Sequence, residues 1–179
     1  DIDADYILDC SGKPKSYENF EKSAIPVNSA HVVNCYWDHP KFEYSLHIAR
    51  PYGWVFGIPL KSRCSIGYLY NRNINSLKEI EEDIKNVFSE YGLNPSNSIQ
   101  NINFENYYRK NNYTDRVCYN GNSSFFLEPM EATSIATMDQ IQRHCFDMWN
   151  NFMSIEEGNL AYRKFMKQAE TMIMMHYFA

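Results

Sequence analysis

Residues 54–70 read WVFGIPLKSRCSIGYLY, and this stretch decides the fold class of the chain. It holds two runs rich in aromatic and aliphatic residues, Trp54–Leu60 and Cys64–Tyr70, with a short polar break between them. Such runs with short breaks are typical of neighbouring strands. Two similar runs precede them, at Ala30–Trp37 and Tyr44–Ala49, so the sequence predicts an antiparallel meander.

Three helices are expected along the chain. Ser76-Leu77-Lys78-Glu79 is a capping-box pattern, and Gly92 ends the helix that it opens. A longer apolar stripe runs from Ile135 to Phe152, and a second capping box at Ser154 opens the last helix. Further strands are expected at Tyr6–Cys10 (short and buried), Ile99–Tyr108 and Arg116–Tyr119. This order predicts an α/β fold with α+β character, an antiparallel or mixed sheet followed by long helices.

Composition excludes several classes of protein. Hydrophobic residues make up 44% and charged residues 22% of the 179 residues, as in globular proteins that bury a core. The net charge of -5 argues against nucleic acid as a partner, and no apolar run approaches the ~20 residues of a membrane-spanning helix. The cysteines and histidines show neither metal-ligand spacing nor a disulfide framework. No metal is therefore expected, and the cytoplasm is the expected location.

The segment Glu128-Pro129-Met130-Glu131-Ala132-Thr133-Ser134 places a carboxylate and two hydroxyls at the start of an expected helix. Backbone amides at a helix start attract small anions, so Thr133 and Ser134 are candidates for holding a halide. Glu131 is a candidate for accepting a proton or stabilising positive charge on a substrate. Alternatively, Thr133 or Ser134 only caps the helix, and Glu131 only favours its dipole. Glu128 is expected to be structural, and His144 and His176 to be surface or core residues.

Two glycine-containing turns and one strand complete the candidate sites. Asp9-Cys10-Ser11-Gly12 and Gly121-Asn122 are turns that let backbone approach a nucleotide, although no G-x-G-x-x-G pattern is present. The strand 53–60 alternates bulky and small residues. It predicts either one wall of a pocket for a planar substrate or simple filling of the core by Trp54 and Phe56.

Together these motifs resemble the flavin-dependent tryptophan halogenases. Asp9-Cys10-Ser11-Gly12 is similar to the family's Asp-Cys-Ser/Thr-Gly turn, and Gly53–Leu60 to its Gly-Trp-x-Trp-x-Ile-Pro-Leu signature. Gly121–Ile135 is similar to its long motif ending in Glu-Pro-Leu-Glu-Ser/Ala-Thr-Ser-Ile. Gly67–Tyr70 and Met175-His176-Tyr177 resemble the family's Gly-Tyr-Val-Tyr and late Leu-His-Tyr motifs. The likeness covers nearly the whole chain, in order.

The resemblance implies an FAD-dependent enzyme that oxidises chloride or bromide through a peroxyflavin and halogenates an electron-rich, tryptophan-like aromatic substrate. A flavin reductase would supply the reduced FAD. Glu131 would be the catalytic carboxylate, Thr133 and Ser134 the halide region, and Ser11, Gly12, Gly121 and Asn122 the residues along FAD. The barrier between substrate and flavin would consist of Trp54, Phe56, Ile58 and Pro59.

The resemblance also implies a domain division. Residues 1–28 would end the FAD-binding domain, 29–110 form a substrate-side sheet with one helix, 111–153 return to the FAD-binding domain, and 154–179 begin a helical region. The family's glycine-rich loop and active-site lysine belong before residue 1, so the chain is expected to be an interior fragment, inactive alone and weak in FAD binding. Its oligomeric state is not predicted.

The chain departs from the family at Phe56, which replaces the second tryptophan of the signature. A flavin-dependent hydroxylase or other monooxygenase on the same scaffold is therefore an alternative, because fold does not determine chemistry. A catalytically silent fragment or binding module is a second alternative.

Overall fold

The computed structural model describes residues 3–178 and divides into two compact units. Unit 1 comprises Asp1–Ile25 and Glu105–Ala179, and unit 2 comprises Pro26–Phe104. The predicted boundaries after residues 28 and 110 lie close to these two crossing points. The assignment of FAD and substrate to particular segments stays a prediction, and each unit is described by itself below.

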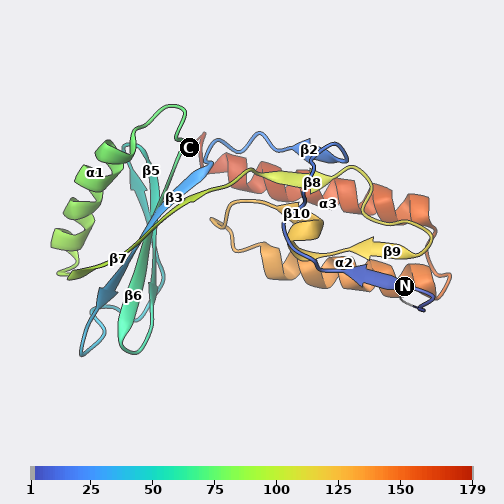
Figure 1. Cartoon of the computed structure of the whole chain (residues 1–179), viewed down its shortest axis with the longest axis horizontal. Helices are drawn as coiled ribbons and strands as arrows, with labels where there is room; N and C mark the ends of the chain where they lie inside the picture. Colours follow the sequence, from blue (N-terminus) through green and yellow to red (C-terminus); the bar gives the residue numbers. More distant parts are fainter. Residues whose placement is uncertain (1–2, 179) are drawn as a thin grey trace. The chain divides into compact units, whose positions relative to one another are not determined.

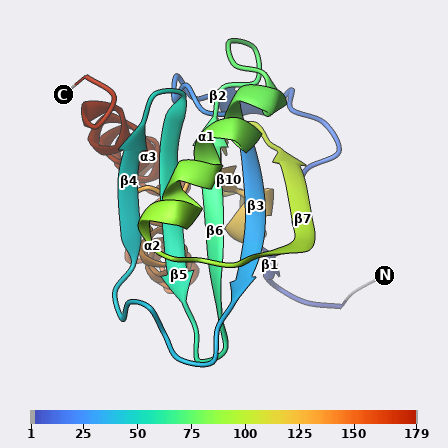
Figure 2. The ribbon, with the colours of Figure 1, turned by 90° about the vertical axis from the view of Figure 1, so that its left-hand side faces the viewer.

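Unit 2 is a five-stranded antiparallel sheet in the order β4-β5-β6-β3-β7 (Figure 2). Its strands are β3 (Ser29–Tyr36), β4 (Leu46–Arg50), β5 (Gly53–Pro59), β6 (Arg63–Tyr70) and β7 (Pro95–Asn103). The four predicted runs are confirmed as strands, and β4, β5 and β6 form a meander. The meander is wrong at β3, which pairs with β6 and β7 instead of β4. The segment 37–45 between β3 and β4 is longer than a hairpin loop, so β4 joins the opposite edge.

Helix α1 (Leu77–Glu90) covers one face of this sheet (Figure 2). Its predicted start is confirmed by the reciprocal capping box of Ser76 and Glu79. Its predicted stop is also confirmed. Gly92 has a φ of +59°, in the left-handed region, and Leu93 N–H donates to the Phe88 carbonyl at 2.8 Å. The helix buries its apolar face against the sheet, each fully buried aliphatic side chain contributing about 1.5 to 3 kcal/mol.

A buried ion pair joins the sheet to α1. Arg50, at the end of β4, donates from Nε to Asp83 Oδ2 at 2.9 Å and from a second nitrogen to Oδ1. Tyr68 O–H donates to the same carboxylate at 2.8 Å. The Arg50 and Asp83 side chains are only 17% and 10% exposed. The hydrogen bonds from Arg50 hold the pKa of the Asp83 carboxyl below its usual value, against the opposing effect of burial.

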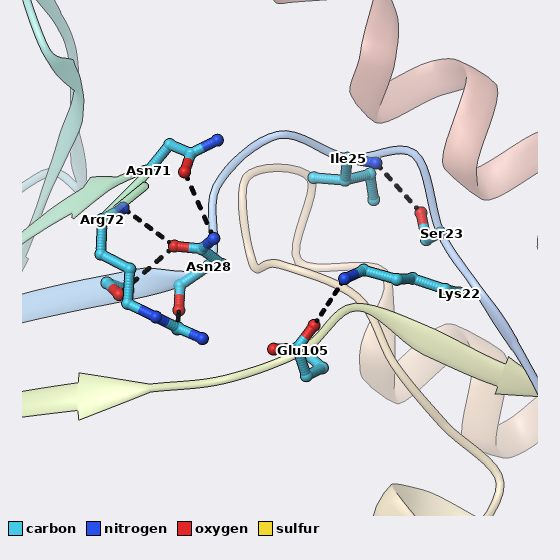
Figure 3. Close-up of polar contacts among 8 residues, drawn as sticks. Lys22, Ser23, Ile25, Asn28, Asn71, Arg72 and Glu105 are labelled. Carbon is cyan, nitrogen blue, oxygen red and sulfur yellow. Dashed lines mark hydrogen bonds and ion pairs between the residues drawn. The ribbon is translucent and has the colours of Figure 1, made fainter. Parts of the chain in front are cut away.

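Short side-chain contacts fasten the segments at which the chain passes between the units (Figure 3). Within unit 2, Asn28 donates to Asn71 at 3.3 Å and accepts the Arg72 backbone N–H at 3.0 Å, which ties the start of β3 to the end of β6. Within unit 1, the Lys22 ammonium lies 3.2 Å from the Glu105 carboxylate. Each unit therefore holds its own end of the crossing segments.

Gly53, the first residue of β5, provides a test of the packing in this sheet. A Cβ there would lie 1.9 Å from the Leu69 carbonyl oxygen, and its φ of +153° disfavours other residues. We expect Gly53→Ala to lower the free energy of unfolding by about 2 to 3 kcal/mol, measured by urea denaturation, because a backbone atom cannot move aside without breaking the ladder.

Gly67→Ala is the matched comparison. The three atoms nearest to its Cβ would be outer atoms of the Phe56 ring, the closest at 2.2 Å, and Phe56 is partly exposed. A side chain can rotate where a carbonyl cannot, so we expect a smaller loss than at Gly53. Equal losses at the two positions would contradict this account of the clash.

Unit 1 combines two small sheets with two long helices (Figure 1). A parallel pair consists of β1 (Ile7–Asp9) and β9 (Val117–Tyr119), and a three-stranded antiparallel sheet has the order β10-β8-β2. The latter strands are β2 (Phe20–Lys22), β8 (Tyr107–Arg109) and β10 (Phe125–Phe126). Strand β1 was predicted as buried, and the structure shows it half-buried. Its only strand partner among residues 3–178 is β9.

The prediction of one continuous strand at Ile99–Tyr108 is wrong. It is split into β7, which ends at Asn103, and β8, which begins at Tyr107 in the other unit. Asn106 lies between them and makes other bonds: its carbonyl accepts from Ser23 N–H at 2.9 Å and its side chain from Glu128 N–H at 2.8 Å. Residues whose polar groups bind elsewhere cannot continue a ladder.

Helices α2 (Ser134–Trp149) and α3 (Ile155–Met175) follow β10. The capping box at Ser154 is confirmed. The predicted α2 stripe is confirmed at Ile141 and Cys145 but wrong at its ends, since Ile135 is 80% and Phe152 75% exposed. Phe152 lies beyond the helix, where helical spacing no longer applies. No helix within residues 3–178 is long and apolar enough to cross a membrane.

Candidate functional site

Two backbone turns lie together at the carboxyl ends of the parallel strands β1 and β9. Asp9 and Tyr119 are the last paired residues of the two strands. The turn with Ser11 and Gly12 follows β1, and the turn with Gly121 and Asn122 follows β9, so both turns begin at the same end of the strand pair. Asn120 N–H donates to the Asp9 carbonyl at 2.8 Å, and Ser11 N–H to the Asp9 side chain at 2.8 Å. The carboxyl ends of parallel strands are where nucleotides commonly bind, and the four predicted residues occupy that position.

The glycines in both turns adopt conformations that other residues avoid. Gly12 has a φ of +95° and Gly121 a φ of +58°. A Cβ built on Gly12 would meet no atom of the described residues within 4 Å, so its backbone faces open space. Such bare, open backbone suits close approach by a flat or phosphorylated group. The turns therefore fit a dinucleotide cofactor at this edge of unit 1.

Two side chains of β8 hold the second turn, the 3₁₀ segment η1 (Gly121–Ser123). Tyr107 O–H donates to the Asn122 carbonyl at 2.8 Å, and Arg109 Nε donates to the Ser123 carbonyl at 2.7 Å. The Arg109 guanidinium also lies 3.4 Å from the centre of the Tyr119 ring. These contacts were not predicted from the sequence. Their only signal was the alternation that puts Tyr107 and Arg109 on one face of a strand.

The segment before α2 is a strained turn. Ala132 has a φ of +50°, unusual for a residue with a side chain, and its N–H donates to the Pro129 carbonyl at 2.9 Å. Glu128 is 1% exposed, and the Tyr177 hydroxyl donates to its carboxylate at 3.0 Å. The structural role expected for Glu128 agrees with this burial. Strained non-glycine backbone persists only where the surroundings hold it, and it gathers at functional sites.

The start of α2 does not have the capping arrangement offered as an alternative. Thr133 occupies the N-cap position with helical dihedral angles and makes no side-chain capping bond. Its carbonyl instead accepts from the backbone and the hydroxyl of Thr137, both at 2.9 Å. Ser134 is the first helical residue, and the first turn contains no acidic residue. Capping by Thr133 is therefore wrong, and among residues 3–178 no side chain is seen to cap this end of the helix.

Glu131 meets a residue for which the sequence analysis expected no function. His176, directly after α3, contacts the Glu131 carboxylate through Nε2. The side chains of Glu131 and His176 are 29% and 47% exposed, so the pair is open to solvent or ligand. The Met175-His176-Tyr177 motif was the available signal, although its position in sequence did not indicate a partner. His144, in contrast, is a core residue as expected: it lies 3.2 Å from the Tyr113 hydroxyl, and burial lowers its pKa.

The predicted barrier strand lies in unit 2. Trp54, Phe56 and Ile58 point to the face of the sheet opposite α1, since Val55 and not Trp54 belongs to the core beneath α1. Trp54 is 4% exposed and stacks on His47 with ring centres 5.6 Å apart, whereas Ile58 is 49% exposed. Pro59 ends the strand. The expectation that Trp54 and Phe56 fill the core is therefore confirmed for Trp54, which is buried, but wrong for Phe56, which is half-buried.

Comparison with solved structures identifies the fold as that of the flavin-dependent halogenases. The chain is similar to BrvH, a flavin-dependent halogenase from Brevundimonas sp. BAL3 (TM-score 0.79, 24% identity, covering 98% of this chain and 38% of that one). It is also similar to a flavin-dependent halogenase from Xanthomonas campestris, with a TM-score of 0.78 and 20% identity over 98% of this chain and 37% of that one. A tryptophan 6-halogenase from Streptomyces toxytricini matches with a TM-score of 0.73 and 22% identity over 98% of this chain and 39% of that one.

The family model described as tryptophan halogenase matches residues 1–179. The chain therefore belongs to the tryptophan halogenase family. It spans less than two fifths of the length of the three halogenases named above. The resemblance inferred from the sequence motifs is confirmed.

Proposed function

We propose that the protein containing this chain is a flavin-dependent halogenase acting on an electron-rich, tryptophan-like aromatic substrate. The observation that carries this proposal is the turn before α2. It presents the partly exposed Glu131 carboxylate beside a helix start at which the N-cap residue, Thr133, makes no side-chain capping bond. A flavin reductase as the source of reduced FAD, chloride or bromide as the halide, and the cytoplasm as the location belong to the same proposal.

The two turns at β1 and β9 are proposed to hold FAD through the backbone of Ser11, Gly12, Gly121 and Asn122. Their support is the open backbone and left-handed glycine conformations described above. When bound, reduced FAD would donate electrons to oxygen and so activate it as the oxidant that makes a halide electrophilic. The residues of the chain have the tasks of binding, orientation and proton transfer.

Each of these tasks is proposed for particular residues. The amides of Thr133 and Ser134 at the start of α2 are proposed to hold the halide, because a helix start attracts small anions. Glu131 is proposed to accept the proton of the substrate or to stabilise its positive charge. The barrier between substrate and flavin is proposed to consist of Trp54, Phe56, Ile58 and Pro59.

Gly12 tests the FAD site. We expect Gly12→Ala in the complete protein to weaken FAD binding by about 10-fold, because a side chain would enter the open space before the turn and strain a φ of +95°. Titration of FAD with fluorescence or calorimetric detection measures this.

Gly92→Ala is the matched control for this variant. Gly92 has a φ of +59° and also faces open space, but it ends α1 in unit 2. The control should lose stability of about 1 kcal/mol through backbone strain and retain FAD affinity. If both variants bind FAD equally well, the turn at Gly12 is not the cofactor site.

Halide dependence tests the reaction itself. The complete protein, with FAD, a flavin reductase and an indole panel, should form chlorinated or brominated products that appear only when the halide is added. Mass spectrometry detects them by their isotope patterns. Phe56, which replaces a family tryptophan, favours a flavin-dependent hydroxylase as the second candidate. Oxygen-containing products without halogen would overturn the first proposal in favour of the second, and no product together with no FAD binding would favour a silent protein.

A further inference from the structure

We infer that His176 and Tyr177 form a carboxylate clamp, in which His176 is a positioning residue that fixes the orientation of Glu131 for the reaction. This inference rests on the proposed function of Glu131. The two clamp residues are adjacent in sequence and contact the two carboxylates of one segment: His176 meets Glu131, and Tyr177 meets Glu128.

The two clamp residues directly follow helix α3, which is packed firmly against the rest of unit 1. Ile173, in the last turn of α3, is fully buried. The helical bonding continues past the end of α3, since His176 N–H donates to the Ile173 carbonyl at 3.1 Å and Tyr177 N–H to the Met174 carbonyl at 3.0 Å. The direction of both clamp side chains is therefore set by the helix and not by a free chain segment.

The carboxylates need such a holder because their own segment is a strained turn around Ala132. A glutamate with 29% of its side chain exposed would otherwise occupy several rotamers, and ordering it costs conformational entropy. The contact with His176 Nε2 engages Glu131 Oε1. Within residues 3–178 the other oxygen, Oε2, has no hydrogen-bond partner. The clamp thus orients the carboxylate through one oxygen and leaves the second for a substrate.

The adjacent Tyr177 bond gives the clamp its second point of attachment. Glu128 is buried and its N–H is already bonded to Asn106, so its end of the segment is fixed to the body of unit 1. The Tyr177 hydroxyl adds a bond from α3 to the same residue. Two contacts from one helix end to positions 128 and 131 restrain both the place and the rotation of the turn between them.

The test compares two substitutions at one position in the complete protein. His176→Phe removes the hydrogen bond, whereas the amide of His176→Gln can still donate to Glu131. We expect His176→Phe to lower kcat of halogenation on the order of 10-fold with little change in KM, because a misplaced catalytic group costs turnover. His176→Gln should restore most of this loss. Equal losses in both variants, or an unchanged kcat in His176→Phe, would overturn the clamp.

A double-mutant cycle asks whether His176 acts through Glu131. In a Glu131→Gln background, His176→Phe should cause little further loss of kcat, since the group that it positions is already gone. A loss that simply adds to that of Glu131→Gln would show a separate role for His176 and overturn the inference. His39→Gln, at an exposed histidine of unit 2, is the control for substitution chemistry and should retain wild-type turnover.

A measurement on the chain itself separates this inference from the proposed function. With ¹⁵N-labelled histidine, the His176 ring resonances should shift on Glu131→Gln and stay in place on Glu18→Gln, which changes an exposed glutamate. Unshifted resonances would overturn the clamp whether or not the complete protein halogenates. An inactive wild-type protein with shifted resonances would instead overturn the proposed reaction and leave the contact standing.

Discussion

Glu131→Gln in the complete protein is expected to lower kcat of halogenation by about 10²-fold or more, typical of losing a positioned acid–base or charge-stabilising group. The melting temperature should barely change, because the Glu131 side chain is partly exposed and lies before the first turn of α2. Steady-state turnover and thermal unfolding of the same variant measure both quantities.

The alternative to this prediction is that Glu131 has only a structural role at the start of α2. A residue that only favours the helix dipole would, when replaced, reduce stability by up to ~1 kcal/mol and leave turnover intact. Glu18→Gln, at an exposed position of unit 1, is the matched control and should alter neither quantity. Near-normal turnover of Glu131→Gln with a lowered melting temperature would sink the catalytic assignment.

Asp83→Ala is expected to lower the free energy of unfolding of unit 2 by about 3 to 5 kcal/mol, as is typical of a buried ion pair that loses one partner. The substitution leaves the Arg50 guanidinium, 17% exposed, without its carboxylate. It also leaves the fully buried Tyr68 hydroxyl without its acceptor. Urea denaturation followed by tryptophan fluorescence measures the loss. A Trp149→Phe background restricts the signal to Trp37 and Trp54, which both lie in unit 2.

Glu82→Ala provides the control on the neighbouring position of α1. Its side chain is 63% exposed and its carboxylate lies 3.9 Å from the Lys78 ammonium, so its loss should change stability by no more than about 0.5 kcal/mol. If Asp83→Ala costs as little as Glu82→Ala, the ion pair does not hold α1 on the sheet.

The same pair predicts a pH dependence with a definite sign. The pKa of the Asp83 carboxyl is lowered in the folded state, first by the hydrogen bonds from Arg50. A lowered folded pKa contributes stability that is present above the unfolded value of about 3.9 and is lost as the pH falls through the folded value. The difference in stability between the wild type and Asp83→Ala should therefore be full near pH 7 and shrink below about pH 4. A difference that grows on acidification would contradict the assignment.

Local patterns predicted the elements that depend on neighbouring residues. The capping boxes at Ser76 and Ser154 and the stop at Gly92 need only residues within one turn, so the sequence determined them. The strands around Trp54 and Tyr68 followed from side-chain type in the same way. The order β4-β5-β6-β3-β7 did not, since it depends on the length of the connection after β3 and on pairing between distant segments.

The candidate site was likewise predicted in part from the sequence and in part shown only by the tertiary structure. The motifs indicated the family and the residues Ser11, Gly12, Gly121, Asn122, Glu131, Thr133 and Ser134 from their order alone. Only the tertiary structure brought the two glycine turns to adjacent ends of β1 and β9, more than a hundred residues apart in the chain. Only it placed His176 against Glu131. A sequence shows which side chains exist and which local bonds they can make, whereas contacts across long chain separations depend on how the buried faces of whole elements pack together.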